Sequence, residues 1–362
     1  MPDQPPIRIW ALLGPHRGDN NQVLALAKAL GFPFEEKQLS YNRLRSLQPA
    51  LLGASFRSLD RSSRSLVEGE PPDLTISTGH RSVPVVRALK RRSGGRMRSV
   101  HLGYPRIAPR HFDLVVPTPE YPIPDAPNVL RVPFALSPLQ VAEPDRSDLA
   151  ELAGFAHPRR LFVLGGPTLY WQLPVLDMIA ALDRLLKRSA SDGGSVWVVG
   201  SPRTPDDLIS AVRERLAAAS VPTLMAPSEG SPSYRALLEA ADEIYVTADS
   251  VAMVADTVNT GKRVGIVPIA RSRLGRLTMA VMDKLRPGKR LFPRDLRFFW
   301  AALRQQGLGG TLEEPRASDP PDYIAMVADR VRQLLEQPPR LATGDHDSGR
   351  PASASPVARG LA

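Results

Sequence analysis

The chain has 362 residues, a formal net charge of +10 and no cysteine. This length is enough for two domains, and for a buried core that needs no disulfide. The absence of cysteine excludes a disulfide framework, a thiolate zinc site, an iron–sulfur cluster and a cysteine nucleophile. The surplus of basic residues favours anionic partners such as phosphorylated small molecules or an acidic membrane face.

The beginning of the chain, residues 1–6, lacks the basic and apolar regions of a secretory signal. No stretch approaches the roughly 20 apolar residues that a membrane span needs. We therefore expect a cytoplasmic protein, with a peripheral contact to an anionic membrane surface as a further expectation.

The first half of the chain is built from strand–loop–helix units. A predicted strand over 7–13 leads through a glycine-containing loop into a helix over 22–30, whose apolar residues recur at helical spacing. A second strand over 73–77 leads through residues 78–81 into another helix. Short strands over 97–102 and 112–116 follow.

The second half repeats this pattern. We expect strands over 160–164, 195–199, 221–226, 243–247 and 262–267, and helices near 174–188, 206–219, 233–240, 250–260 and 322–336. Repeated units of this kind predict parallel sheets that bind ligands at the carboxyl ends of their strands.

The expected fold class is α/β, with two Rossmann-like domains whose parallel sheets face an interdomain cleft. We place the N-terminal domain at 1–137, a linker at 138–157, the C-terminal domain at 158–310, a C-terminal helix within 311–336 and a disordered tail at 337–362.

The loop over 14–21 follows a strand and opens a helix, so its backbone amides and the helix dipole favour an anion. Its spacing is not the dinucleotide fingerprint, so a nicotinamide cofactor is not indicated. The alternative is a tight turn in which Asp19 or Asn20 caps the helix. The two interpretations stay open.

Gly165 and Gly166 occupy the same place in the second half, where glycines let the backbone come close to a phosphate. A plain turn is the alternative. Ser250 begins a helix and either caps it or binds a phosphate oxygen. Asp256 lies two turns further, where an acid accepts hydrogen bonds from ribose hydroxyls or is merely solvated.

His16 and His80 follow strand ends and are candidate general bases, since the unperturbed pKa of histidine is near 6.5; most lone loop histidines are not catalysts. We reject Asp345-His346-Asp347 as a metal site because it lies in the tail, and we expect no metal. The basic clusters over 90–98 and 271–297 lack a nucleic-acid-binding motif, so we expect a solvated or membrane-facing surface and no nucleic acid. Binding of a diphosphate by Arg276 or Arg286 stays open as an alternative.

Several segments together resemble a known family. They are WALLG at 10–14 with RGDNNQ at 17–22, STGHRS at 77–82, HLGYPR at 101–106, LGGP at 164–167 and DSVAM at 249–253. Over residues 7–335 the chain resembles the mitochondrial-fission "elongated mitochondria" family of plants and its bacterial relatives, some of which are labelled nucleoside-diphosphate-sugar epimerases. That family is similar to GT-B glycosyltransferases, especially the peptidoglycan transferase that adds GlcNAc to a lipid acceptor.

The resemblance implies a GT-B-like fold in which the C-terminal helix packs back on the first domain. The stretch over 234–261 is similar to the donor-binding region of that transferase. There an acid five residues before a glycine holds the ribose, so the role carries over to Asp256, as Asp in place of Glu. Pro167 stands where the transferase has Ser, which leaves Thr168 to supply a hydroxyl.

We therefore expect a glycosyltransferase-like protein that binds a nucleotide-diphosphate sugar, UDP-linked, and transfers the sugar to a cell-envelope or lipid-linked acceptor without a metal or other cofactor. The expected donor residues are Gly165, Gly166, Thr168, Gly200, Ser201, Asp249, Ser250 and Asp256. The acceptor-side loop residues are Gly14, Arg17, Gly18, Asn20, Asn21, Gly79 and Arg81, and the candidate bases are His16, Asp19 and His80.

Two alternatives remain. One is an epimerase on the same fold, which would turn over the donor without any acceptor. The other is a non-catalytic scaffold at a membrane, as the role of the plant relatives in recruiting a division dynamin implies.

Overall fold

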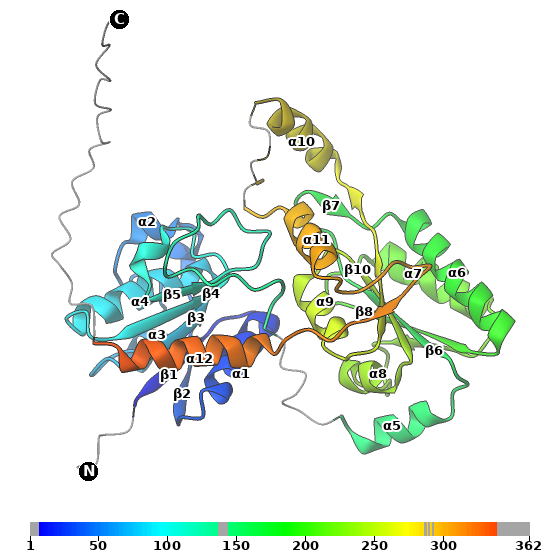
Figure 1. Ribbon diagram of the computed structural model, residues 1–362, viewed down its shortest axis with the longest axis horizontal. Coiled ribbons are helices and arrows are strands. Elements are labelled where there is room, and N and C mark those ends of the chain that lie inside the picture. Colours follow the sequence, from blue (N-terminus) through cyan, green and yellow to red (C-terminus); the bar gives the residue numbers. More distant parts are fainter. Residues whose placement is uncertain (1–6, 137–143, 286–287, 289, 292, 339–362) are drawn as a thin grey trace, which may run out of the picture.

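The computed structural model describes residues 7–136, 144–285, 288, 290–291 and 293–338. Its two large sheets belong to two lobes that lie next to each other (Figure 1). Helices cover both faces of each sheet, as expected for doubly wound α/β domains. The α/β class and the parallel sheets that the sequence predicts are confirmed.

The N-terminal sheet has five parallel strands in the order β2-β1-β3-β4-β5. Its elements are β1 (Ile9–Leu13), α1 (Arg17–Ala29), β2 (Phe34–Gln38), α2 (Pro49–Leu52), α3 (Arg61–Leu66), β3 (Leu74–Thr78), α4 (Gly79–Arg92), β4 (Arg98–Leu102) and β5 (Leu114–Val116). Successive residues of β1 face opposite sides. Ile9 and Ala11 pack with α1, whereas Trp10 and Leu12 pack with α4. Burial on both faces is why this strand is a continuous apolar run.

The C-terminal sheet has the order β13-β11-β10-β6-β8-β9, and only β13 is antiparallel to its neighbour. Its strands are β6 (Arg159–Leu164), β8 (Ser195–Gly200), β9 (Thr223–Ala226), β10 (Glu243–Thr247), β11 (Arg263–Val267) and β13 (Arg316–Ala317). The helices are α5 (Arg146–Ala153), α6 (Val175–Asp192), α7 (Asp206–Ala217), α8 (Tyr234–Ala240), α9 (Val251–Val258), α10 (Arg273–Leu285) and α11 (Leu296–Gln305). A small antiparallel pair joins β7 (Trp171–Gln172) to β12 (Ala270–Arg271).

A buried charge network closes the amino-terminal edge of this sheet. The Glu243 carboxylate accepts hydrogen bonds from Arg160 Nε at 3.0 Å and from the Tyr245 hydroxyl at 2.7 Å. It also pairs with Arg263 at 3.0 Å and Arg188 at 3.3 Å. The Arg160 side chain is only 2% exposed, so its charge has lost most of its hydration. The ion pair with Glu243 offsets much of this desolvation cost.

The last helix, α12 (Tyr323–Glu336), returns to the N-terminal lobe, where Figure 1 shows it beside α1. Its residues Val327, Val331 and Leu334 join the core formed with α1 and β1. This apolar stripe is what the spacing of the sequence predicts for this helix.

Three sequence-based boundaries need correction or fall outside the structure. The expected linker over 138–157 contains α5, whose Leu152 is buried in the C-terminal core. The segment over 311–322 adds the edge strand β13 before α12 begins. Of the expected tail, 339–362 lies outside the described residues, as does the rejected Asp345–Asp347 pair.

Within the described ranges, no helix is both long and apolar enough to cross a bilayer.

Candidate functional site

The strand order of each sheet places a crevice at the carboxyl ends of its strands. In the N-terminal sheet the chain proceeds to β2 on one side of β1 and to β3 on the other; in the C-terminal sheet the same reversal lies between β6 and β10. Ligands of open α/β sheets bind at such reversals. A cavity of about 150 Å³ lies where these strand ends of the two lobes meet.

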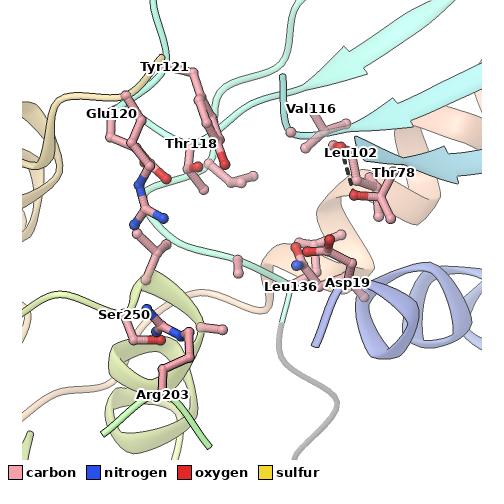
Figure 2. Close-up of a pocket in the computed structure, with 17 residues that line it drawn as sticks. Asp19, Thr78, Leu102, Val116, Thr118, Glu120, Tyr121, Leu136, Arg203 and Ser250 are labelled. Atoms are coloured by element: carbon pink, nitrogen blue, oxygen red, sulfur yellow. Dashed lines mark hydrogen bonds between the residues drawn. The ribbon is translucent and has the colours of Figure 1, made fainter. Parts of the chain in front are cut away.

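Both lobes and the connection between them line this interlobe cavity. Figure 2 shows Asp19 of α1 facing Ser250 and Arg203 across the cavity, with Glu120 and Tyr121 on a third side. The other lining residues are Gln22, Thr78, Leu102, Gly103, Val116, Thr118, Val132, Ala135, Leu136, Val251, Ala252 and Arg294.

Two arginines give the C-terminal side of the cavity its positive charge. Arg203 lies in the loop after β8, and its side chain is 50% exposed. Arg294 precedes α11 and donates to the backbone carbonyl of Asp249 at 3.2 Å. Its Nε is buried and has no partner among the described residues. Both guanidiniums are suited to bind a phosphate. Neither arginine is among the site residues predicted from the sequence.

The glycines after β6 serve packing and not ligand binding, which corrects the prediction. The Gly165 amide donates to the Thr247 hydroxyl at 2.8 Å, and the Gly166 amide donates to the Asp249 carboxylate at 2.9 Å. A Cβ on Gly166 would lie 2.4 Å from the Arg203 carbonyl oxygen. The two amides are therefore occupied, and Gly166 allows the Arg203 backbone to come close.

Asp249 is fully buried and holds this loop arrangement together, so it is not a donor ligand. Besides the Gly166 amide it accepts from Thr247 at 2.7 Å and lies 3.5 Å from Arg203. Burial raises the pKa of this carboxyl, while the hydrogen bond from Thr247 lowers it. Asp249 thus connects the β6, β8 and β10 loops and orients Arg203 toward the cavity.

We expect Gly166→Ala to lower the free energy of unfolding by about 2 kcal/mol or more, because the added methyl group would clash with the Arg203 backbone. Gly14→Ala is the matched control, since a Cβ there meets no atom within 4 Å. Urea denaturation of both variants measures the difference. If the two variants were equally stable, the packing role assigned to Gly166 would be wrong.

The remaining predicted donor residues after β6 and β8 do not line the cavity. Ser201 forms a turn in which its amide donates to the Thr204 hydroxyl at 2.8 Å, and Gly200 packs against Ile209. The Thr168 amide donates to the Trp171 carbonyl at 2.9 Å. These residues shape the loops that carry Arg203.

Ser250 reaches the cavity, whereas Asp256 does not. The Ser250 hydroxyl accepts from the Met253 amide at 3.4 Å, so it caps α9, and the helix amino terminus faces the cavity. Asp256 is absent from the lining. Its carboxylate lies near the Tyr234 hydroxyl, whose pKa is raised well above its ordinary value by burial and then by this carboxylate. The geometry does not support the ribose role predicted for Asp256.

Among the three predicted bases, only Asp19 lines the cavity. Burial raises the pKa of its carboxyl, and nearby His16 and Arg294 lower it in part. His16 is exposed. Burial, with help from Arg106 and Arg81, lowers the pKa of His80 to about 4, so this imidazole is neutral at pH 7. A carboxyl with a raised pKa in a cleft is suited to proton transfer.

The other acceptor-side residues build the loop geometry. The Asn20 side chain closes the loop before α1 through its hydrogen bonds with the Gly14 amide and carbonyl at 2.8 and 2.9 Å. Neither Asp19 nor Asn20 caps the helix, since the cap position is His16. Gly79 has φ +70°, a conformation that favours glycine at this strand-to-helix turn.

Three other predicted acceptor-side residues are described and do not line the cavity. The side chain of Arg17 lies outside the described parts of the chain. The remaining residues of this set are Gly18, Asn21 and Arg81.

Glu120 is a second cavity carboxyl that the sequence did not indicate. It is 1% exposed, and burial raises its pKa while Arg294 lowers it in part. One of its carboxylate oxygens is buried without a partner in the described structure. No group of three or more His, Asp or Glu side chains suited to a metal occurs among the described residues.

Comparison with known proteins gives the family. The family model for mitochondrial fission ELM1 matches residues 17–335. The chain belongs to the mitochondrial fission ELM1 family. This confirms the resemblance seen in the sequence motifs. No curated protein matches the chain.

Solved structures show which fold this ELM1-family chain has. It is similar to MnaA of S. aureus in a co-structure with UDP, with a TM-score of 0.50, 12% identity, and 91% of this chain and 97% of that chain covered. The UDP-GlcNAc 2-epimerase of Methanocaldococcus jannaschii gives a TM-score of 0.52, 12% identity and coverage of 91% and 99%. MurG of Acinetobacter baumannii gives a TM-score of 0.45 and 14% identity, with 91% of this chain and 92% of that chain covered. The chain has the GT-B-like fold that the sequence predicts.

Proposed function

We propose that the interlobe cavity binds the diphosphate of a nucleotide-diphosphate sugar, and that the protein transfers the sugar to an acceptor hydroxyl held by the N-terminal lobe. One observation carries this proposal: Arg203, Arg294 and the amino terminus of α9 line the cavity from the C-terminal lobe, and Figure 2 shows Asp19 facing Arg203 and Ser250 across it. This pairs an anion-binding side with a proton acceptor.

The diphosphate is the part of the ligand that the cavity itself recognises. Two guanidiniums and a helix amino terminus supply hydrogen bonds and positive charge to phosphate oxygens. The volume of about 150 Å³ is smaller than a typical site for a whole ligand. We therefore place the diphosphate and the anomeric carbon in the cavity, and the nucleoside outside it.

In the proposed transfer, the Asp19 carboxylate takes the proton of the acceptor hydroxyl. The acceptor oxygen forms a bond to the anomeric carbon of the sugar as the bond from that carbon to the phosphate oxygen breaks. The electron pair leaves with the nucleoside diphosphate. Arg203 and Arg294 stabilise the negative charge that develops on this leaving group.

The comparisons support a uridine nucleotide as the first ligand to test. One neighbour is described with UDP, and another is a UDP-GlcNAc 2-epimerase. For the acceptor we propose a lipid-linked or cell-envelope hydroxyl, which places the working protein in the cytoplasm at a membrane surface.

The pH dependence of turnover tests the role of Asp19. A base acts when deprotonated, so activity should fall as the pH drops through the pKa of Asp19. Burial raises this pKa, so the fall should occur at a higher pH than for an ordinary Asp. Asp19→Asn should remove this limb and lower kcat by about a hundredfold. The measurement is the pH profile of UDP release from UDP-GlcNAc, with water in place of the acceptor. An unchanged limb in Asp19→Asn would assign the base elsewhere.

A thermal-shift series with UDP-, GDP-, ADP- and CMP-sugars tests the proposed function as a whole. A ligand that binds only the native state raises the melting temperature by mass action. We expect UDP-GlcNAc to raise it at millimolar concentration. No shift with any of the four would favour the non-catalytic scaffold.

An epimerase is the second candidate, because Glu120 adds another cavity carboxyl with a raised pKa. Two such carboxyls could remove and return a proton on the sugar. Proton NMR of UDP-GlcNAc incubated with the protein alone separates the two functions. A new sugar epimer formed without an acceptor identifies the epimerase, whereas a transferase releases UDP.

A further inference from the structure

Helix α10 carries a stripe of exposed apolar side chains. Leu274, Leu277, Val281 and Leu285 follow one another at intervals of three or four residues, so they share one face of the helix. Their exposed fractions are 47%, 66%, 46% and 73%. A contiguous apolar surface of this kind marks an interaction site more often than scattered single residues do.

Another face of α10 is anchored to the protein, so the stripe cannot turn inward. Met279 is fully buried, and Met282 packs against the same C-terminal core. A Cβ on Gly275 would lie 2.1 Å from the Tyr170 carbonyl oxygen, which shows how closely the helix approaches that backbone. The amphipathic helix therefore has one face for packing and a second apolar face for a partner.

The charges beside the stripe are basic. Arg273 and Lys284 are about three turns apart and lie along one edge of the stripe. Arg276 is also exposed, and the described residues provide no ion pair for any of the three. Asp283, the one acidic residue of α10, is 3.4 Å from Arg297. This combination complements an anionic surface with an apolar layer beneath it.

A second patch of the same composition lies on the N-terminal lobe. Leu44, Leu47 and Leu51 are exposed there, beside the exposed side chains of Arg43 and Arg45. In Figure 1, α2, which carries Leu51, and the protruding α10 both lie at the upper edge of the molecule. The N-terminal lobe therefore also carries exposed apolar and basic side chains of this kind.

We propose that α10 is an interfacial helix that docks the protein on an anionic lipid surface, with the stripe inserted among the acyl chains and the cations at the headgroups. Apolar burial combined with attraction to anionic lipids is how such helices bind. A second copy of the chain is the weaker fit, because it would bring the same cations together. The proposal does not depend on the proposed sugar transfer.

Vesicle sedimentation tests this proposal on the full chain without nucleotide. We expect binding to vesicles of phosphatidylcholine with phosphatidylglycerol, and weaker binding to phosphatidylcholine alone. Leu277→Asp with Val281→Asp should weaken the binding by at least about tenfold. Leu176→Asp with Ala180→Asp is the matched control, because it places two charges at the same spacing on the exposed face of α6.

Several outcomes would overturn the proposal: no binding to anionic vesicles, equal loss in both double variants, or full binding by the α10 variant. Analytical ultracentrifugation separates the remaining alternative. A concentration-dependent dimer that only the α10 variant abolishes, together with no vesicle binding, would assign the stripe to a second copy. Melting temperature and UDP binding of the α10 variant, both expected to be unchanged, show that the variant is folded and keep this test separate from that of sugar transfer.

Discussion

Replacing Arg203 and Arg294 together by alanine is expected to weaken UDP binding by about a hundredfold or more, while the fold is retained. Each charge-assisted hydrogen bond to a phosphate contributes roughly 1.5–3 kcal/mol, and the variant removes one source of such bonds for each arginine. Both guanidiniums line the interlobe cavity. Both guanidiniums also lie near buried carboxylates, Asp249 and Glu120, so the melting temperature of the variant is measured alongside to show that it is folded.

Isothermal titration with UDP measures this effect. Arg184→Ala with Arg213→Ala is the matched control, because it removes two exposed arginines from α6 and α7 and changes the net charge equally. We expect the control to bind UDP within about twofold of the unmodified protein. Equal weakening in both variants would mean that general charge, and not the cavity, attracts the nucleotide.

Glu243→Ala is expected to lower the free energy of unfolding by about 3–5 kcal/mol, the range for breaking a buried ion pair. The loss leaves Arg160 without its partner on the sheet edge, although Asp192 still binds that guanidinium at 3.0 Å. Tyr245 loses its hydrogen-bond acceptor at the same time. The cost arises because charged and polar groups remain buried with too few partners.

Urea denaturation measures this loss, with Glu313→Ala as the control. Glu313 forms an ion pair with Arg184 in which both side chains are more than half exposed. Such surface pairs contribute about 0–1 kcal/mol. If Glu243→Ala were as stable as this control, the buried network would be neutral to stability.

The positions of the strands could be predicted from the sequence because helices cover both faces of each sheet. Strand β1 is apolar throughout, and β6, β8 and β10 each contain an apolar run of three or four residues; a glycine or threonine follows each run. Less could be predicted for α2, α3, α10 and α11. They are short, or they mix apolar and basic residues without a clear boundary, so the pattern there is weak.

The candidate site could be predicted only in part. Asp19 and Ser250 follow strands directly, so their place at the carboxyl edge of a sheet follows from local order. Arg203 and Glu120 lie in loops whose sequences contain no recognisable motif. They line the cavity only because residues far away in the sequence pack beside them. For Asp249 the predicted position after a strand is correct, but the predicted role is not. Its carboxylate accepts a hydrogen bond from the Gly166 amide and is not available to a ligand.

The sequence alone determined that the protein has two doubly wound lobes, since alternating apolar runs and amphipathic helices allow few other folds. Only the tertiary structure decided which polar groups face the cavity and which are already bonded, because hydrogen-bond partners such as Asp249 and Gly166 are 83 residues apart. It also decided that the basic segment over 271–297 divides between the cavity, through Arg294, and the outer face of α10. The burial of a side chain and its hydrogen-bond partners depend on the residues packed around it, so a local sequence pattern does not predict them.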